Sequence, residues 1–212
     1  MDLHDELRTM REHAPEVLPA EALETMGKAA AELAESGLAQ RAVNIGAQAP
    51  DFTLPSADGR EVTLSALLAD GHVVLTFYRG AWCPFCNIAL RHLQLHQQEI
   101  AARGARLVAV SPQVPDESLS LAEKQHLDFD ILSDIGSDVA KQYGIAFDLS
   151  DELGRLYDRL GFDLQRVNSG HARTLPLPAT YVIDRDGTVR WAFVDTDYTR
   201  RAEASDILAA LG

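Results

Sequence analysis

The sequence predicts an α/β fold with a central mixed sheet, helices on both faces, and a helical extension before it. First, the apolar, β-branched run His72–Tyr78 is followed by a helical pattern and a second buried run at 107–110, which together form a βαβ unit. Second, strand-like runs at 180–184 and 188–194 flank Asp186-Gly187, a dipeptide typical of hairpin turns. A chain of 212 residues fits one large domain with an appendage.

Residues 1–44 contain no strand pattern and predict two helices, the first ending before Pro15 and the second running from about Ala20 to Gly37. Their apolar stripes consist of Leu3, Leu7 and Met10 in the first helix and Leu23, Met26, Ala30 and Leu33 in the second. We therefore divide the chain into a helical extension, 1–44, and a main domain, 45–212. Such stripes cover the main domain or a second subunit, or form a lid or docking element, and the sequence does not separate these roles.

The main domain continues as an alternation of strands and helices. Asp58-Gly59 predicts a hairpin between 52–54 and 61–63, and Gly104 stands where a helix over 87–103 would end. The further expected elements are a helix near 116–125, a strand at 129–132, helices near 137–143 and 150–160, and a last helix from about 201.

Composition and charge exclude several functional classes. A formal net charge of −13 repels nucleic-acid phosphates and anionic lipids. The N-terminus lacks a basic segment followed by an apolar one, and the apolar stretch Val73–Phe77 is too short to span a bilayer. We expect a cytoplasmic protein that binds neither nucleic acid nor membrane.

The two cysteines, Cys83 and Cys86, lie where a buried strand meets the start of a helix. Free N–H groups and the positive dipole end of the helix favour a thiolate there, and Arg79 adds positive charge, so we expect both thiols to be acidified. Two intervening residues let one helical turn bring the sulfurs within bonding distance, which allows a disulfide to open and close.

Two other interpretations of the pair are a buried structural couple and a zinc site. Zinc needs two more ligands, and the nearest candidates, His92 and His96, lie about 80–120° around the helix from Cys86. These histidines fit a polar helix face better, and we expect no metal.

Motifs spread along the chain resemble a known family. They are Gly46–Leu54, Phe129–Asp134, Val139–Ile145 and Tyr181–Gly187. In this order and spacing they resemble the thioredoxin superfamily and, within it, the peroxiredoxins of the alkyl hydroperoxide reductase and thiol-specific antioxidant type. The resemblance covers about Gly46 to Leu211 and implies a thioredoxin-like fold.

The active loop departs from that family's pattern of proline, three residues, threonine or serine, two residues and the peroxidatic cysteine. The ungapped register places the peroxidatic position on Cys86, the hydroxyl position on Cys83 and the proline position on Arg79. Trp82–Cys86 instead resembles the thioredoxin and glutaredoxin site, in which Cys83 would be the exposed nucleophile and Trp82 would shape access to it.

The late part of the chain carries further implied site residues. Pro178 falls where typical peroxiredoxins have a peroxide-binding arginine, and it resembles the cis-proline that faces the cysteines in thioredoxins. We therefore expect a cis Pro178 in contact with the pair, with main-chain groups of Leu177 open to a thiol partner. Arg201, or Arg200 beside it, lies near the position of a second arginine that would stabilise the thiolate.

The resemblance implies an enzyme without a cofactor, a thiol-dependent peroxidase. A thiolate attacks a hydroperoxide, a Cys83–Cys86 disulfide forms, and an external thioredoxin-like or glutathione-type reductant restores the dithiol. The alternatives are a thioredoxin-like thiol-disulfide oxidoreductase with little peroxidase activity and a non-catalytic redox-sensing module. We expect Cys83 to attack protein disulfides and Cys86 to take the peroxide. The sequence allows a homodimer and does not specify the peroxide or the reductant.

Overall fold

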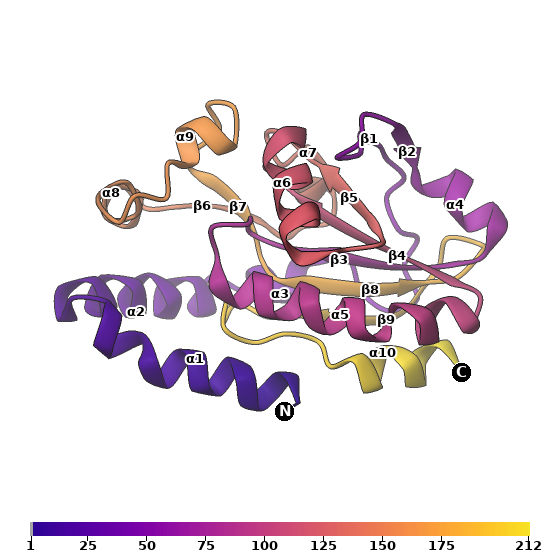
Figure 1. The fold of residues 1–212 in the computed structure, drawn as a ribbon, viewed down its shortest axis with the longest axis horizontal. Helices are drawn as coiled ribbons and strands as arrows, with labels where there is room; N and C mark the ends of the chain where they lie inside the picture. The colour runs from indigo at the N-terminus through magenta and orange to yellow at the C-terminus, as the bar shows by residue number, and fades with distance from the viewer. Residues whose placement is uncertain (1) are drawn as a thin grey trace.

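The computed structural model describes residues 2–212, without the side chains of residues 119, 120 and 122–124. Its central sheet has the strand order β5-β4-β3-β8-β9 (Figure 1). The sheet strands are β3 (His72–Phe77), β4 (Ala105–Ser111), β5 (Asp130–Ser133), β8 (Ala179–Ile183) and β9 (Val189–Val194). β3, β4 and β5 are parallel, whereas β8 is antiparallel to both β3 and β9. The predicted mixed sheet and its βαβ unit are confirmed.

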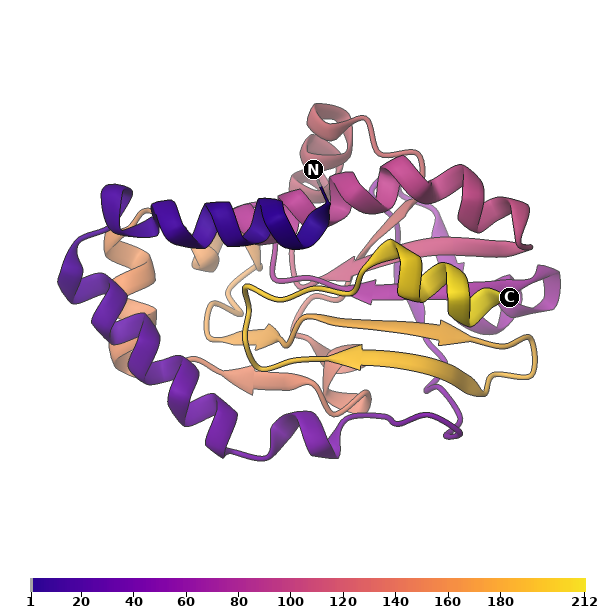
Figure 2. The ribbon, with the colours of Figure 1, turned by 90° about the horizontal axis from the view of Figure 1, so that it is seen from below.

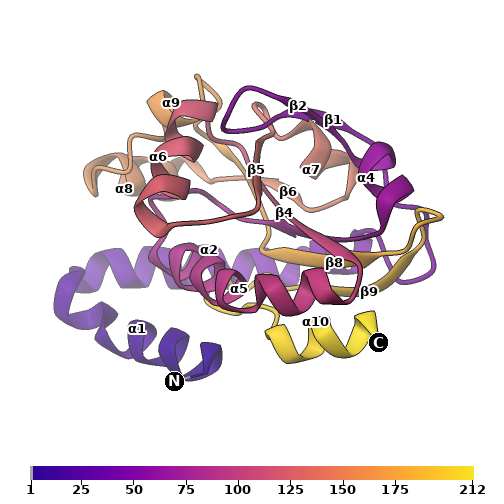
Figure 3. The ribbon, with the colours of Figure 1, turned by 45° about the vertical axis from the view of Figure 1, so that its right-hand side comes forward.

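Alternate residues of the buried strands face opposite sides of the sheet, as a two-residue period requires. One face, with Val74 and Ala109, packs on α5 (Pro84–Ala102) and α10 (Ala204–Leu211). The other, with Val73 and Val108, packs on α4 (Leu64–Asp70) and α7 (Asp138–Gln142). Figure 3 shows the sheet between these two helical layers.

Further elements of the main domain lie outside the sheet and these two layers. They are β1 (Thr53–Pro55), β2 (Glu61–Thr63), α6 (Pro115–Gln125), β6 (Ala146–Asp148), α8 (Asp151–Arg159), α9 (Leu164–Val167) and β7 (Thr174–Pro176). β1 and β2 form the predicted antiparallel hairpin, in which Thr53 pairs with Thr63. α4, β6, α9 and β7 were not expected from the sequence, because none is longer than seven residues and a period cannot be recognised over so few positions.

The extension forms α1 (Leu3–Val17), α2 (Ala20–Glu35) and the short α3 (Leu38–Arg41). α1 runs through Pro15 rather than ending before it, which corrects the sequence expectation. A proline removes a single backbone donor, and helical bonding continues past it, as Leu18 N–H donates to the Ala14 carbonyl at 2.9 Å. α2 ends as expected, with Gly37 in the left-handed region at φ 69°.

Both long helices of the extension lie against the main domain (Figure 2). α1 packs on α5, where Leu3 and Leu7 join the buried cluster that contains both cysteines. Glu6 on α1 reinforces this contact by pairing with His92 at 2.8 Å and with Arg91. α2 instead lies along α8.

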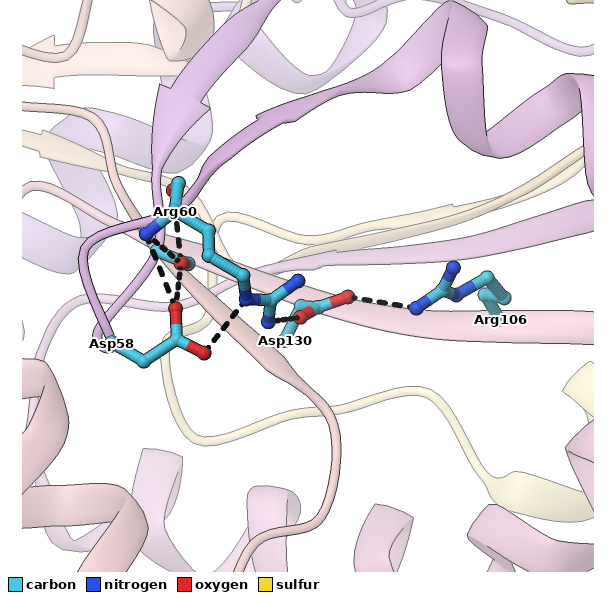
Figure 4. Close-up of polar contacts among 5 residues, drawn as sticks. Asp58, Arg60, Arg106 and Asp130 are labelled. Atoms are coloured by element: carbon cyan, nitrogen blue, oxygen red, sulfur yellow. Dashed lines mark hydrogen bonds and ion pairs between the residues drawn. The ribbon is translucent and has the colours of Figure 1, made fainter.

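A polar cluster ties the β1–β2 hairpin to the sheet edge (Figure 4). Arg60 Nε donates to Asp58 Oδ2 at 2.8 Å, and its Nη2 donates to Asp130 Oδ1 at 2.9 Å. Arg106 Nη2 lies 3.5 Å from the other oxygen of Asp130. Hydrogen bonds from Ser56 and Arg60 lower the pKa of Asp58 to about 2, so this carboxylate stays charged across the neutral range.

No helix within the described residues is both long and apolar enough to cross a membrane.

Candidate active site

The two thiols are placed by the connection between β3 and α5. Cys83 is the N-cap of α5, Pro84 occupies the first helical position, and Cys86 N–H donates to the Cys83 carbonyl at 3.1 Å. Proline suits that position because its missing N–H would have no helical partner there. Both cysteines are free thiols, and they are 2% and 0% exposed. Cys83 is therefore not the exposed nucleophile that a thioredoxin-type site would present.

The loop before Cys83 is fixed by close packing. Gly80 has φ 141°, a backbone conformation that favours glycine, and a Cβ there would lie 2.5 Å from Trp82 Nε1. The Ala81 N–H donates to Gln113 Oε1 at 2.6 Å, and Gln113 is itself buried. Trp82 is thereby held against the loop, beside the thiols whose access we expected it to shape.

Arg201 is the cation that reaches the sulfur. Its Nη2 donates to Cys86 Sγ at 3.0 Å, and its Nη1 donates to the carbonyls of Tyr198 and Arg200 at 2.5 and 2.7 Å. Arg200 instead pairs with Asp195 at the surface. Of the two candidate arginines, the structure brings Arg201 to the thiol.

Arg79 forms a second buried cation beside the sulfurs. Its Nη2 donates to the Tyr157 hydroxyl at 2.6 Å, and its guanidinium carbon lies 4.9 Å from the Trp82 ring centroid and 4.8 Å from that of Tyr198. Burial disfavours its charge, but the neighbouring Tyr157 and the two sulfurs outweigh burial and raise the pKa of Arg79. Among the described residues, neither Arg79 nor Arg201 has a carboxylate within ion-pair distance.

The electrostatics separate the two thiols. Burial raises the pKa of Cys86, but a hydrogen bond with the Cys83 thiol, the charge of Arg201 and the Arg79 main-chain N–H together bring it well below its ordinary value. The Cys83 pKa is raised well above its ordinary value, first by that same hydrogen bond, in which Cys83 is the donor, and then by burial. The expectation that both thiols are acidified is therefore wrong for Cys83, because a proton shared between two sulfurs stabilises only one thiolate.

Pro178 is buried immediately before β8, but its peptide bond is trans, so the expected cis bond is wrong. The chain runs extended from β7 into β8, and no turn there requires the cis form. Leu177 N–H donates to the Ile145 carbonyl at 2.8 Å, continuing the β6–β7 pairing. The Leu177 N–H is thus already occupied and is not open to a thiol partner, which corrects the expectation for that main-chain group.

A small cavity of about 30 Å³ joins several of these residues. Arg79, Leu177 and Pro178 line it together with Tyr157 and Tyr198. Arg79 links two groups of predicted site residues, because its charge acts on both sulfurs and its side chain lines the cavity with Leu177 and Pro178. Neither cysteine lines that cavity. Sequence reasoning missed Tyr157 and Tyr198, since an isolated tyrosine more than 70 positions from the cysteine motif carries no spacing signal.

The chain was compared with known proteins. The sequence model of the AhpC/TSA family matches residues 45–192. Peroxiredoxin Bcp of Escherichia coli is 29% identical over 147 residues, which are 69% of this chain and 83% of that protein. A putative peroxiredoxin of Mycobacterium tuberculosis is 32% identical over 161 residues, which are 76% of this chain and 91% of that protein.

Solved structures give the same picture of the fold. The crystal structure of peroxidoxin BcpB from Mycobacterium tuberculosis has a TM-score of 0.63 at 28% identity, covering 80% of this chain and 96% of that one. Reduced Prx3 of Vibrio vulnificus in complex with H2O2 has a TM-score of 0.65 at 22% identity, covering 80% and 99% of the two chains. At that identity the second match shows the fold alone, which is the thioredoxin-like fold expected from the sequence.

Proposed function

We propose a division of roles between the two cysteines of this chain, which belongs to the AhpC/TSA family and is a thiol-dependent peroxidase of the peroxiredoxin type. Cys86 attacks the hydroperoxide, and Cys83 then attacks the sulfenic acid formed on Cys86. The 3.0 Å contact between the Arg201 guanidinium and Cys86 Sγ is the observation that carries this assignment. A buried cation needs a counterion, and among the described residues Arg201 has no carboxylate within ion-pair distance, whereas the Cys86 sulfur lies 3.0 Å away.

The reaction follows from this polarity. The Cys86 thiolate attacks one peroxide oxygen, the O–O bond breaks, and Cys86 becomes a sulfenic acid while the other oxygen leaves as an alkoxide or hydroxide. Arg79 and Arg201 stabilise the developing negative charge on the leaving oxygen. The Cys83 thiol can give its proton to that oxygen, and the resulting Cys83 thiolate then attacks the Cys86 sulfur. A disulfide forms, and hydroxide leaves and takes a proton from solvent to become water.

The disulfide must then be reduced by an external dithiol. We propose a thioredoxin-like or glutathione-type reductant and a cytoplasmic location, where such reductants are kept reduced. Both cysteines are buried, so the start of α5 must become exposed before the reductant can reach the disulfide. A homodimer is a further proposal, which sedimentation of the purified protein checks directly.

Sulfenic acid trapping tests the assignment of the two cysteines. Cys83→Ser and Cys86→Ser variants receive one equivalent of H2O2, followed by a sulfenic acid trap and mass spectrometry. We expect the trapped adduct in Cys83→Ser, which retains Cys86, and not in Cys86→Ser, because the low pKa and the cation both lie at Cys86.

The other outcomes are equally informative. A trapped adduct only in Cys86→Ser would assign the peroxide step to Cys83 and overturn the roles proposed here. In a third outcome, neither variant reacts faster than a free thiol at matched pH, while the wild-type protein reduces insulin disulfides. The protein would then be assigned as a thiol-disulfide oxidoreductase instead of a peroxidase.

A further inference from the structure

The cavity beside Arg79 has one wall that the matched family segment does not supply. Residues 45–192 contain its Arg79, Leu177 and Pro178 side, whereas Met26, Ala29, Ala30 and Leu33 of α2 form the opposite side. Figure 1 shows α2 extending alongside the domain below α8. The extension therefore does more than cover an apolar surface, because part of it faces the space next to the reacting groups.

α2 is held firmly enough to act as a wall. Ala22 is 3% exposed and joins the buried cluster of α8 that contains Tyr157, with Met26 and Ala29 packed against the same cluster. Leu33 packs against the separate cluster on one face of the sheet. Tyr157 holds Arg79 by a 2.6 Å hydrogen bond, so the helix, the tyrosine and the cation are in one continuous contact network.

The cavity combines a cationic end with an apolar end. Arg79 lies 3% exposed at one side, with its Nε unpartnered, and its charge acts on both sulfurs. The α2 side chains present only methyl, methylene and thioether groups. Neither cysteine lines the cavity, so Arg79 is the link between this space and the sulfurs. A hydroperoxide held here with its oxygens toward Arg79 would direct its organic substituent at Met26 and its neighbours.

Size is the decisive property of this space. A volume of about 10–15 Å³ holds one water molecule. The cavity of about 30 Å³ consequently accommodates H2O2 and leaves no room for a bulky substituent while α2 is in place. Met26 is the longest and most flexible of the α2 side chains on this wall, and its removal would open the most space.

We propose that α2 is a specificity wall of the peroxidase, in which Met26, backed by Ala29 and Ala30, restricts the substrate to small hydroperoxides. The proposal rests on the peroxidase function proposed above. Discrimination arises because a large substituent would clash with a packed helix, and a missing or extra methylene in a hydrophobic pocket changes kcat/KM by about 10- to 200-fold.

The experiment compares kcat/KM for H2O2 and for cumene hydroperoxide, with an external dithiol in excess, in the full-length protein. The wild-type enzyme should prefer H2O2 by at least about tenfold, and Met26→Ala should raise the cumene-to-H2O2 ratio by about tenfold. Met26→Phe narrows the same space and should lower the ratio. Met10→Ala is the matched control, because it removes a partly buried methionine from α1, which does not line the cavity.

Three results would overturn the proposal and leave the peroxidase standing. These are a wild-type enzyme that reduces both peroxides equally well, an unchanged ratio in folded Met26→Ala and Met26→Phe variants, and an equal change in Met10→Ala, which would mean general loosening. If Met26→Ala does not fold, Met26→Phe decides alone. A wild-type protein that reduces neither peroxide would instead contradict the proposed function.

Discussion

Cys83 occupies the position at which the family pattern has a hydroxyl residue, and its thiol supplies the donor that a hydroxyl would. Its hydrogen bond lowers the pKa of Cys86, so replacement by serine should preserve much of this effect and replacement by alanine should remove it. We expect the Cys86 pKa, measured from thiolate absorbance at 240 nm, to be higher in Cys83→Ala than in Cys83→Ser. Equal values in the two variants would show that Cys83 does not donate to the thiolate.

Arg201 makes the other specific contact with Cys86, and its removal should affect both pKa and rate. Arg201→Gln loses the positive charge 3.0 Å from the sulfur, so the Cys86 pKa should rise and the pH of half-maximal peroxide reduction should move upward with it. At neutral pH we expect kcat/KM to fall by about 10²-fold, as for the loss of one oxyanion-stabilising donor. Arg200→Gln is the control, since Arg200 pairs with Asp195 at the surface and should leave the profile unchanged.

At the same scale, the sequence locates most of the site but not its environment. The cysteine pair, Arg79 and Arg201 follow from spacing and from the family register. The roles of the two thiols do not, because they depend on which sulfur accepts the shared proton in a buried site. The expected cis bond at Pro178 was wrong because the motif before a strand does not report whether the preceding chain arrives extended or in a turn.

At the scale of elements, long periodic segments were predictable, whereas several short ones without a turn signal were not. β3, α5 and β4 appear within three residues of their expected bounds, because each has either a continuous apolar run or an amphipathic stripe. β6 and β7 are three residues each, and they exist because they pair with one another across 26 to 30 positions of sequence. Tertiary pairing of that kind leaves no local pattern to read.

The attachment of α1 to the main domain is a testable property of this element. Leu7 is 5% exposed and packs in the cluster that includes both cysteines, so Leu7→Ala should lower the free energy of unfolding by about 2–5 kcal/mol. Val17→Ala on the same helix is the control, because Val17 is 76% exposed and its truncation should change stability by less than about 0.5 kcal/mol. Urea denaturation measures both. A Leu7→Ala variant as stable as wild type would mean that α1 is not docked in solution.

For the whole molecule, the buried cations link redox state to stability. In the reduced protein the Cys86 thiolate neutralises part of the charge of Arg79 and Arg201, and disulfide formation removes that anion. A disulfide between Cys83 and Cys86 closes a loop of only four residues, which stabilises the fold by about 2 kcal/mol in the chain-entropy account. The thiolate acts in the opposite direction. Each unit by which folding lowers the Cys86 pKa adds about 1.4 kcal/mol to the free energy of unfolding of the reduced protein, once the pH exceeds the pKa of Cys86 in the unfolded chain.

The balance between these two effects should reverse with pH. Because the folded pKa of Cys86 is depressed, the thiolate contribution is fully present above the unfolded pKa of about 8.5 and is lost as the pH falls through the folded pKa. The disulfide constraint does not titrate. Urea unfolding of the reduced and oxidised proteins should therefore show the reduced form as the more stable near pH 8 and the oxidised form as the more stable below the folded pKa. The comparison stays below about pH 8.5 because the raised pKa of Cys83 destabilises the reduced fold above that value. In Arg201→Gln the crossing should move to higher pH, because this variant stabilises the thiolate less. A stability difference independent of pH would show that the arginines do not hold a thiolate in the reduced protein.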